Sequence, residues 1–187
     1  MNNLIDVSKY KFVIEPRYYF YGWSRSNAVL GRKTVVEQLA KARSYLPKGY
    51  NFKIWDMYRP RSVQIQMLNS FARRIKQQHP KWSKKRIWET VYKFGAKPVL
   101  LVTRMDTHRH GGAVDLTIVD EHSDELYMGT DHDDLTKKAE TKYFERLTPV
   151  NALQKEAKKN RRLLVKSLSK AGFNNYSAEW WHWSSNL

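Results

Sequence analysis

Residue types suited to hydrolytic metal chemistry occur in two separated stretches of the chain. The first is HRHGGAVD, from His108 to Asp115, and the second is EWWH, from Glu179 to His182. A catalytic zinc site needs three protein ligands, an open position for water and a nearby base. The two histidines and the aspartate would supply the ligands, and Glu179 would take a proton from the attacking water. The chain has no cysteine, so nitrogen and oxygen atoms would have to hold any metal.

The same residues also have ordinary structural explanations. A single histidine is more often a surface residue than a ligand, an aspartate shortly after two glycines can cap a turn, and tryptophans near a C-terminus are typical of a core. In a flat strand Glu179 and His182 would point to opposite faces, so a shared site needs a twist, a bulge or a strand end between them. The H-E-x-x-H helix pattern of many zinc peptidases is absent. Spacing by itself therefore leaves both interpretations open.

The stretch AVDLTIV, residues 113–119, has to position the aspartate. Its alternation puts three aliphatic residues on one face and Asp115 on the other, which predicts a strand with one side in the core. Gly111 and Gly112 precede this strand, and glycine permits a positive φ or a close backbone approach. A turn at these glycines can return His108 to the cleft that Asp115 faces.

The rest of the chain mixes helices and strands without a regular βαβ order. This favours an α+β fold, a compact domain whose small antiparallel sheet is flanked by helices. At 187 residues we expect one domain, covering residues 1–187. Ser83 and Asn151 are suited to begin helices, and Gly172 is suited to follow one. The predicted helices are residues 34–46, 61–78, 83–94 and 151–172, and the predicted strands are residues 50–58, 113–119 and 176–183.

Several motifs, in order along the chain, resemble those of one enzyme family. HRHGGAVD fits the pattern H-x-x-G-x-A-x-D, and EWWH fits E-x-x-H. WDMYRP (residues 55–60) fits W-D-x-x-R-P, and DELYMGTDHDD (residues 124–134) is similar to G-E-L-x-x-M-G-x-x-F-D. From about Thr34 to Trp183 the chain resembles the D-alanyl-D-alanine dipeptidases, zinc peptidases of the type used in vancomycin resistance.

The resemblance implies a zinc metallopeptidase with one zinc ion per chain. It makes His108, Asp115 and His182 the metal ligands and Glu179 the general base. It implies hydrolysis of D-alanyl-D-alanine or a closely related short dipeptide, in a compact α+β domain that carries the zinc on a small antiparallel sheet. Resistance to antibiotics and recycling of cell-wall dipeptides are both compatible with that activity.

The resemblance also assigns residues to the substrate. Arg59 would steady the scissile carbonyl oxygen, and Asp133 would bind the free ammonium. Asp106 and Thr107 stand near the position that would meet the terminal carboxylate. Asp106 replaces the family's serine, and an anionic side chain there should repel a carboxylate unless it is paired. His132 replaces the family's phenylalanine before the ammonium-binding aspartate. These departures bear on substrate specificity and leave the metal ligands unchanged.

The charge of the chain raises two alternatives to a cytoplasmic dipeptidase. Lys and Arg number 34 against 18 Asp and Glu, a net charge of +16, which would attract anionic partners. One alternative is an exported or phage-type peptidoglycan carboxypeptidase held on anionic cell-wall polymers. The other is a basic nucleic-acid-binding module, suggested by the cations and aromatics of residues 73–88. A solvated helical face is the simpler explanation of that segment, because no recognised nucleic-acid-binding motif accompanies it.

The sequence also gives expectations about location. No run approaches the ~20 apolar residues of a membrane span. The first residues lack a basic segment followed by an apolar stretch, which a secretory signal would have. We therefore expect a cytoplasmic protein, with an exported or periplasmic location as the alternative.

Overall fold

The centre of the molecule is a 5-stranded sheet in the order β2-β4-β5-β7-β6. A computed structural model describes residues 3–98 and 107–186 of the chain. Neighbouring strands in the sheet are antiparallel, except that β2 and β4 are parallel. The strands are β2 (Val13–Ile14), β4 (Asn51–Asp56), β5 (Ala113–Val119), β6 (Phe173–Asn175) and β7 (His182–Ser185). The predicted α+β fold with a small, mainly antiparallel sheet is confirmed.

Strand β5 lies in the middle of the sheet, and all of its 7 residues are buried. Its aliphatic face packs into the main core with helices α2 (Lys33–Arg43) and α5 (Ala152–Lys170). The opposite face carries Asp115, as the alternation predicts. The hydrophobic effect places the apolar face in the core. This sets the register of the strand and so directs Asp115 to the opposite face.

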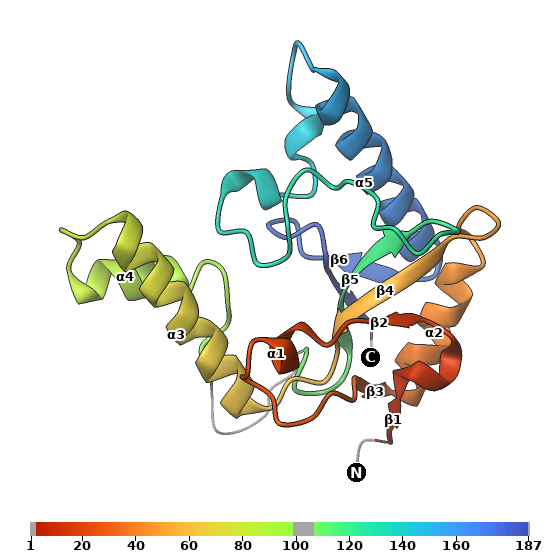
Figure 1. Ribbon diagram of the computed structural model, residues 1–187, viewed down its shortest axis with the longest axis horizontal. Coiled ribbons are helices and arrows are strands. Elements are labelled where there is room, and N and C mark those ends of the chain that lie inside the picture. The colour runs from red at the N-terminus through yellow and green to blue at the C-terminus, as the bar shows by residue number, and fades with distance from the viewer. Residues whose placement is uncertain (1–2, 99–106, 187) are drawn as a thin grey trace.

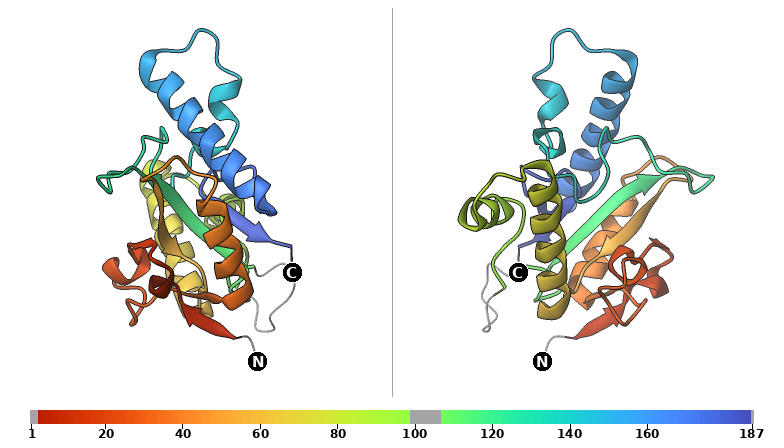
Figure 2. Two further views of the ribbon diagram at one scale, coloured as in Figure 1. Left: turned by 90° about the vertical axis from the view of Figure 1, so that its right-hand side faces the viewer. Right: turned by 60° about the vertical axis from the view of Figure 1, so that its left-hand side comes forward.

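Helices α3 (Arg61–Gln78) and α4 (Lys84–Val91) form a second unit, here called the α3–α4 arm, residues 61–98. The arm and α2 lie on opposite sides of the sheet (Figures 1 and 2). The arm has its own apolar cluster, which includes Phe71 and Ile75 of α3, Ile87 and Val91 of α4, and Tyr18 from α1 (Arg17–Phe20). It therefore packs largely on itself and only partly on the sheet.

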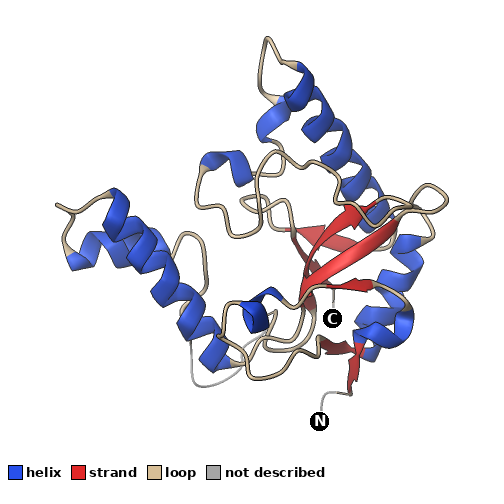
Figure 3. Ribbon diagram, in the orientation of Figure 1, coloured by secondary structure: helices blue, strands red, loops and turns tan. Residues whose placement is uncertain are grey.

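The remaining elements are short. Strands β1 (Leu4–Asp6) and β3 (Leu30–Arg32) pair as a separate antiparallel ribbon. The segment between β5 and α5 is mostly loop, as Figure 3 shows, with two 3-10 helices at Lys137–Ala139 and Tyr143–Glu145; a third 3-10 helix, Val7–Tyr10, follows β1. Within residues 3–98 and 107–186, no helix is long and apolar enough to cross a membrane.

The predicted helix starts are confirmed to within one residue, but α2 ends at Arg43 and not at residue 46, and α4 ends at Val91 and not at residue 94. The Ser83 side chain accepts a hydrogen bond from the backbone N–H of Arg86, and Asn151 forms a capping box with Gln154. Gly172 follows α5 with φ +92°, a conformation that glycine adopts without strain. These contacts explain why α4 and α5 begin where the sequence places them.

The predicted strand over residues 176–183 is wrong for most of its length, because β7 begins only at His182. Trp180 and Trp181 are adjacent and both buried, at 1% and 2% exposure. A turn precedes the strand, in which the N–H of Glu179 donates to the carbonyl of Tyr176 and the N–H of His182 donates to the carbonyl of Glu179. The aromatic pattern of this stretch thus reflects burial in a turn and not a strand alternation.

Candidate metal centre and active-site cleft

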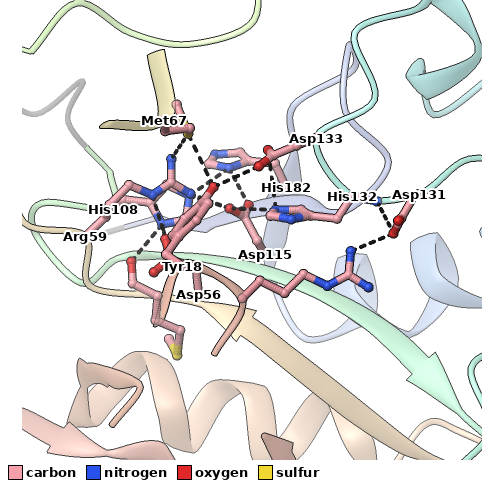
Figure 4. Close-up of polar contacts among 12 residues, drawn as sticks. Tyr18, Asp56, Arg59, Met67, His108, Asp115, Asp131, His132, Asp133 and His182 are labelled. Carbon is pink, nitrogen blue, oxygen red and sulfur yellow. Dashed lines mark hydrogen bonds and ion pairs between the residues drawn. The ribbon is translucent and has the colours of Figure 1, made fainter. Parts of the chain in front are cut away.

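The structure brings together the predicted ligands His108, Asp115 and His182, here called the His–Asp–His cluster (Figure 4). The Nε2 atom of His108 lies 3.0 Å from Nδ1 of His182, which lies 3.0 Å from Oδ1 of Asp115. The third separation, from His108 Nε2 to Asp115 Oδ2, is 3.3 Å. Three ligand atoms at such distances can share one divalent cation.

The backbone explains how distant residues meet at this point. Asp115 of β5 and His182 of β7 are direct partners in the antiparallel register, so their side chains lie side by side. His108 reaches them through a tight turn in which the N–H of Gly111 donates to the carbonyl of His108. Gly111 has φ +66°, and an added Cβ would lie 2.7 Å from Leu4 Cδ2. Only glycine fits this turn without a shift of its neighbours.

The hydrogen bonds of His108 fix which nitrogen faces the cluster. Its Nδ1 lies 2.7 Å from the carbonyl oxygen of Met57, which can only accept, so Nδ1 carries the proton. The Nε2 lone pair therefore points toward the carboxylate of Asp115. Nη2 of Arg59 lies 3.3 Å from this Nε2 and 2.5 Å from Asp115 Oδ2, so a positively charged group already stands beside both atoms. A histidine anchored through its other nitrogen is typical of metal sites.

Asp115 is buried, and its pKa reflects the groups around it. Burial by itself would raise that pKa, but the surrounding histidines, with His108 contributing most, hold it well below its usual range. The carboxyl group is thus ionised at neutral pH. An ionised carboxylate and two imidazoles form the nitrogen and oxygen donor set that zinc accepts in catalytic sites.

Glu179 lies in the same cleft as the His–Asp–His cluster. The turn before β7 places Glu179 and His182 on the same side, which resolves the objection that a flat strand would separate them. Burial raises the pKa of Glu179 to about 8, and the negative charges of Asp115 and Asp133 add to the effect. A carboxyl group with this pKa can exchange a proton near neutral pH.

Arg59 is buried beside the cluster and is held by two carboxylates. Its Nε donates to Asp56 Oδ2 at 2.7 Å, and its Nη2 donates to Asp115 Oδ2 at 2.5 Å. Burial alone would lower the pKa of Arg59, but the neighbouring negative groups keep that pKa above its ordinary value. The guanidinium is therefore a fixed positive charge at the floor of the cleft.

Asp133 and its neighbour His132 form the other side of the floor. Asp133 has φ +59°, lines the cleft, and accepts a hydrogen bond of 3.4 Å from the Tyr18 hydroxyl. The His132 ring is fully buried, and its Nε2 lies 3.6 Å from both Asp115 Oδ2 and Asp133 Oδ1. Among the described residues, neither ring nitrogen of His132 has a hydrogen-bond partner. His132 therefore lies between the carboxylate of the cluster and the carboxylate predicted to bind an ammonium.

The sequence reasoning left His132, Tyr18 and Asp56 without a role, although all three contact the predicted residues. His132 stood out as a departure from the family pattern, which was a usable signal. Asp56 lies within the recognised WDMYRP motif, which was another. Tyr18 gave no signal, because its place next to Arg59 and His132 depends on how α1 packs against the α3–α4 arm.

The cleft has a volume of about 520 Å³ and extends well beyond the cluster. One wall carries the His–Asp–His cluster, Glu179 and Asp133, and also Thr107, one of the residues predicted to bind substrate. The facing wall comes from the α3–α4 arm and includes Met67, Tyr92 and Phe94. Asp106, the other residue predicted near the substrate carboxylate, lies outside the described residues.

A His–Asp–His cluster around a buried aspartate, with a glutamate in the same cleft of an α+β fold, is typical of a metallopeptidase site. The chain belongs to the D-ala-D-ala dipeptidase family, Peptidase M15, whose model matches residues 21–186. The family resemblance found in the sequence is thereby confirmed, and with it the assignment to the zinc metallopeptidases.

Curated relatives and a solved structure agree with this family. The chain is 26% identical over 159 residues to a D-alanyl-D-alanine dipeptidase of Enterococcus faecalis, covering 84% of this chain and 73% of the relative. It is 28% identical over 174 residues to a D-alanyl-D-alanine dipeptidase of Synechocystis, covering 86% and 70%. The fold is similar to that of the D,D-pentapeptidase VanY of a VanB-type resistance cassette, solved in complex with Zn(II). That match has a TM-score of 0.50 and 15% identity, over 86% of this chain and 75% of the other.

Proposed function

We propose that this chain hydrolyses D-alanyl-D-alanine or a closely related short dipeptide, with one zinc ion in the His–Asp–His cluster and Glu179 as general base. The observation that carries the proposal is the convergence of three ligand side chains and a glutamate in one cleft. Membership of the family and the names of the curated relatives support this class of substrate.

The donor set fits zinc because it combines two imidazoles with an ionised carboxylate and includes no sulfur ligand. When bound, zinc supplies a Lewis acid, which polarises a carbonyl group and acidifies water. The anchoring of His108 by the Met57 carbonyl orients its Nε2 for this purpose. The rest of the reaction depends on side chains of the chain itself.

Glu179 is placed to move the proton of the reaction. A carboxylate oxygen of Glu179 accepts a proton from the attacking water as the water oxygen bonds to the carbonyl carbon. The same proton then passes to the amide nitrogen as the C–N bond breaks and the amine leaves. Burial raises the pKa of Glu179 to about 8 in the zinc-free site, and a bound divalent cation would lower that pKa, so the carboxylate could accept the proton at neutral pH.

Arg59 and Asp133 have complementary roles toward the substrate in this proposal. Negative charge develops on the carbonyl oxygen during attack, and the permanently charged Arg59 can stabilise it from the cleft floor. Asp133 presents a carboxylate to the substrate ammonium, and Thr107 offers a hydroxyl at the end that would hold the substrate carboxylate. A site that binds both ends in this way favours short substrates.

A panel of D- and L-dipeptides, assayed on protein of known zinc content, tests the proposal. We expect release of D-alanine from D-alanyl-D-alanine by the wild-type chain and none by Glu179→Ala at equal zinc content. Hydrolysis that persists in Glu179→Ala would contradict the assigned base. Failure of the wild-type chain on every D,D-dipeptide would contradict the substrate.

One observation favours a second candidate, an exported carboxypeptidase that trims peptidoglycan stem peptides. The cleft of about 520 Å³ continues onto an apolar wall of the arm, formed in part by Met67, Tyr92 and Phe94. A dipeptide whose side chains are methyl groups would leave that wall uncovered. A higher kcat/KM on a stem pentapeptide than on D-alanyl-D-alanine would support this candidate, and activity confined to the dipeptide would reject it.

A further inference from the structure

Half of the net charge of the molecule lies on a small part of the α3–α4 arm. Residues 73–97 contain nine Lys and Arg residues against one acidic residue, Glu89, and so contribute +8 of the total of +16. All nine cationic residues are exposed. The charge is therefore concentrated on one projecting unit and is not spread evenly over the surface.

The cations of this segment have few anionic partners within the protein. In the part of the chain that the structure describes, the ion pair in residues 73–97 is Lys85 with Glu89, at 4.0 Å. Elsewhere cations are matched more closely: Glu145 pairs with Lys158 at 3.0 Å and with Arg162 at 2.6 Å. The arm thus presents positive charge outward, whereas Glu145 of the 3-10 helix Tyr143–Glu145 neutralises part of the charge of α5.

Helix α4 carries this charge against its own stability. Lys84, Lys85 and Arg86 occupy its first turn, and no acidic residue is present there. The N-terminus of a helix is its positive end, so acidic residues stabilise it and cations do not. Residues that destabilise the local structure, such as these cations at a helix N-terminus, are typical of functional sites.

The end of this segment borders the cleft of the metal centre. Tyr92, Phe94 and Pro98 line the cleft, and Tyr92 also lies under the ammonium of Lys97 at 4.9 Å from the ring centroid. These cleft residues follow the C-terminal end of α4, so a polymer bound at the first turn of α4 can extend along this helix toward the cleft. A nucleic acid on the same surface would gain nothing from that proximity.

From these observations we infer that the arm is a docking surface for anionic peptidoglycan, a glycan strand whose peptide stems carry carboxylates. The first turn of α4 and the neighbouring end of α3 bind the carboxylates, and the peptide ends then reach the cleft. The inference rests on the second candidate function, in which the substrate is attached to the cell wall. The surface that would hold this substrate is the arm, and it is separate from the catalytic residues.

The test is cosedimentation of the full-length, zinc-loaded protein with insoluble peptidoglycan at low and high salt. The arm variant is Lys84→Glu with Lys85→Glu, which places acidic residues at a helix N-terminus and so should not weaken the fold. The matched control is Lys155→Glu with Lys159→Glu, two exposed lysines of α5 with the same total change in charge. D-alanyl-D-alanine hydrolysis is measured on all three proteins.

We expect the arm variant to lose at least about tenfold in apparent affinity for peptidoglycan while the control stays close to wild type, because short-range charge contacts dominate over net charge at moderate salt. Hydrolysis of the free dipeptide should be the same in all three. Equal losses in both variants, or an arm variant that binds like wild type, would overturn the docking surface. Tighter binding to DNA than to peptidoglycan, lost in the same variant, would replace it with a nucleic-acid surface. Wild-type protein that binds peptidoglycan through the arm but cleaves no peptide would contradict the proposed function alone.

Discussion

The cleft floor and the α3–α4 arm both depend on cations, but the surroundings of those cations differ. At the floor, Arg59 is buried and donates to both Asp56 and Asp115. On the arm, Lys84 and Lys85 are exposed and stand in a turn without acidic residues. A buried charge needs partners, and removal of one partner from a buried pair costs about 3–5 kcal/mol. An exposed charge is solvated, and its replacement usually changes stability by less than about 0.5 kcal/mol.

Because of this difference, we expect substitutions at the cleft floor to change catalysis and substitutions on the arm to change binding of a polymer. At the floor, neighbours orient His108 through the Met57 carbonyl. They orient Arg59 through the carboxylates of Asp56 and Asp115.

On the arm, Arg74 donates to the backbone carbonyl of Asp133, whereas the exposed Lys84 and Lys85 stand in a helix turn without acidic residues. Paired substitutions, one in each region, can therefore test the distinction directly.

The largest difference is expected for glutamate. Glu179→Gln removes the group that moves the proton, and loss of a general base lowers kcat by about 10²–10⁴-fold. Glu89→Gln, on the arm, should leave kcat unchanged. The measurement is D-alanine release at saturating substrate, with zinc content determined on the same samples. Equal rates for Glu179→Gln and the wild-type chain would show that another residue acts as the base.

The arginine pair should differ somewhat less. Arg59→Lys replaces a rigid fork, bonded to two carboxylates, with a single ammonium, and loss of an oxyanion donor lowers kcat by about 10²–10³-fold. Arg73→Lys keeps an exposed charge on the arm and should have no effect. Steady-state kinetics give kcat and KM of both variants, and thermal unfolding gives their stability. If Arg59→Lys raised KM and left kcat intact, Arg59 would be a binding residue and would not act on the reacting carbonyl.

The histidine pair tests the site without reference to catalysis. His132→Phe removes the ring that lies 3.6 Å from both Asp115 and Asp133. Phenylalanine is the family's residue at this position, and within the described part of the chain neither ring nitrogen of His132 is hydrogen-bonded. We therefore expect a loss of zinc affinity smaller than the loss of about 10–100-fold that follows removal of a hydrogen-bonded support of a metal ligand. His79→Phe, at a ring stacked on Trp82 of the arm, should leave zinc affinity unchanged. Competition with a chromophoric chelator measures both, and identical affinities would show that His132 only fills space.

A separate effect is expected in the zinc-free protein, a pH dependence of its stability. The pKa of Glu179 is raised in the folded state from 4.5 to about 8. The folded state therefore binds more protons than the unfolded chain between these values, and the free energy of unfolding falls as the pH rises through this window. The stabilisation is fully present below pH 4.5 and is lost above about pH 8. Urea unfolding at several pH values should show this fall in the wild-type chain and a weaker one in Glu179→Gln.

The sequence predicts the larger elements because each has a strong local pattern. The helix over residues 61–78 coincides with α3, and Ser83 and Asn151 cap α4 and α5 as expected. The strand over residues 113–119 coincides with β5. The short strands β1, β2, β3 and β6 have only two or three residues each, too few for an alternation to be visible.

The sequence predicts those residues of the candidate site that lie within recognisable motifs. The convergence of His108, Asp115 and His182 was expected and is found. The objection to Glu179 arose from treating residues 176–183 as a strand, and it disappears because a turn precedes β7. The contacts of His132 depend on tertiary packing, so no local pattern could have shown that its ring lies between two carboxylates.

The most direct measurement of the central claim is the zinc content of the wild-type chain and two aspartate variants after dialysis against buffered zinc. Asp115→Ala removes a ligand, whereas Asp131→Ala removes a more exposed carboxyl group that pairs with Arg17. We expect about one equivalent of zinc in the wild-type chain and in Asp131→Ala, and less than about a tenth in Asp115→Ala, because a zinc site that loses one of three protein ligands loses most of its affinity. Less than about half an equivalent in the wild-type chain, or equal zinc in both variants, would contradict a zinc centre at His108, Asp115 and His182.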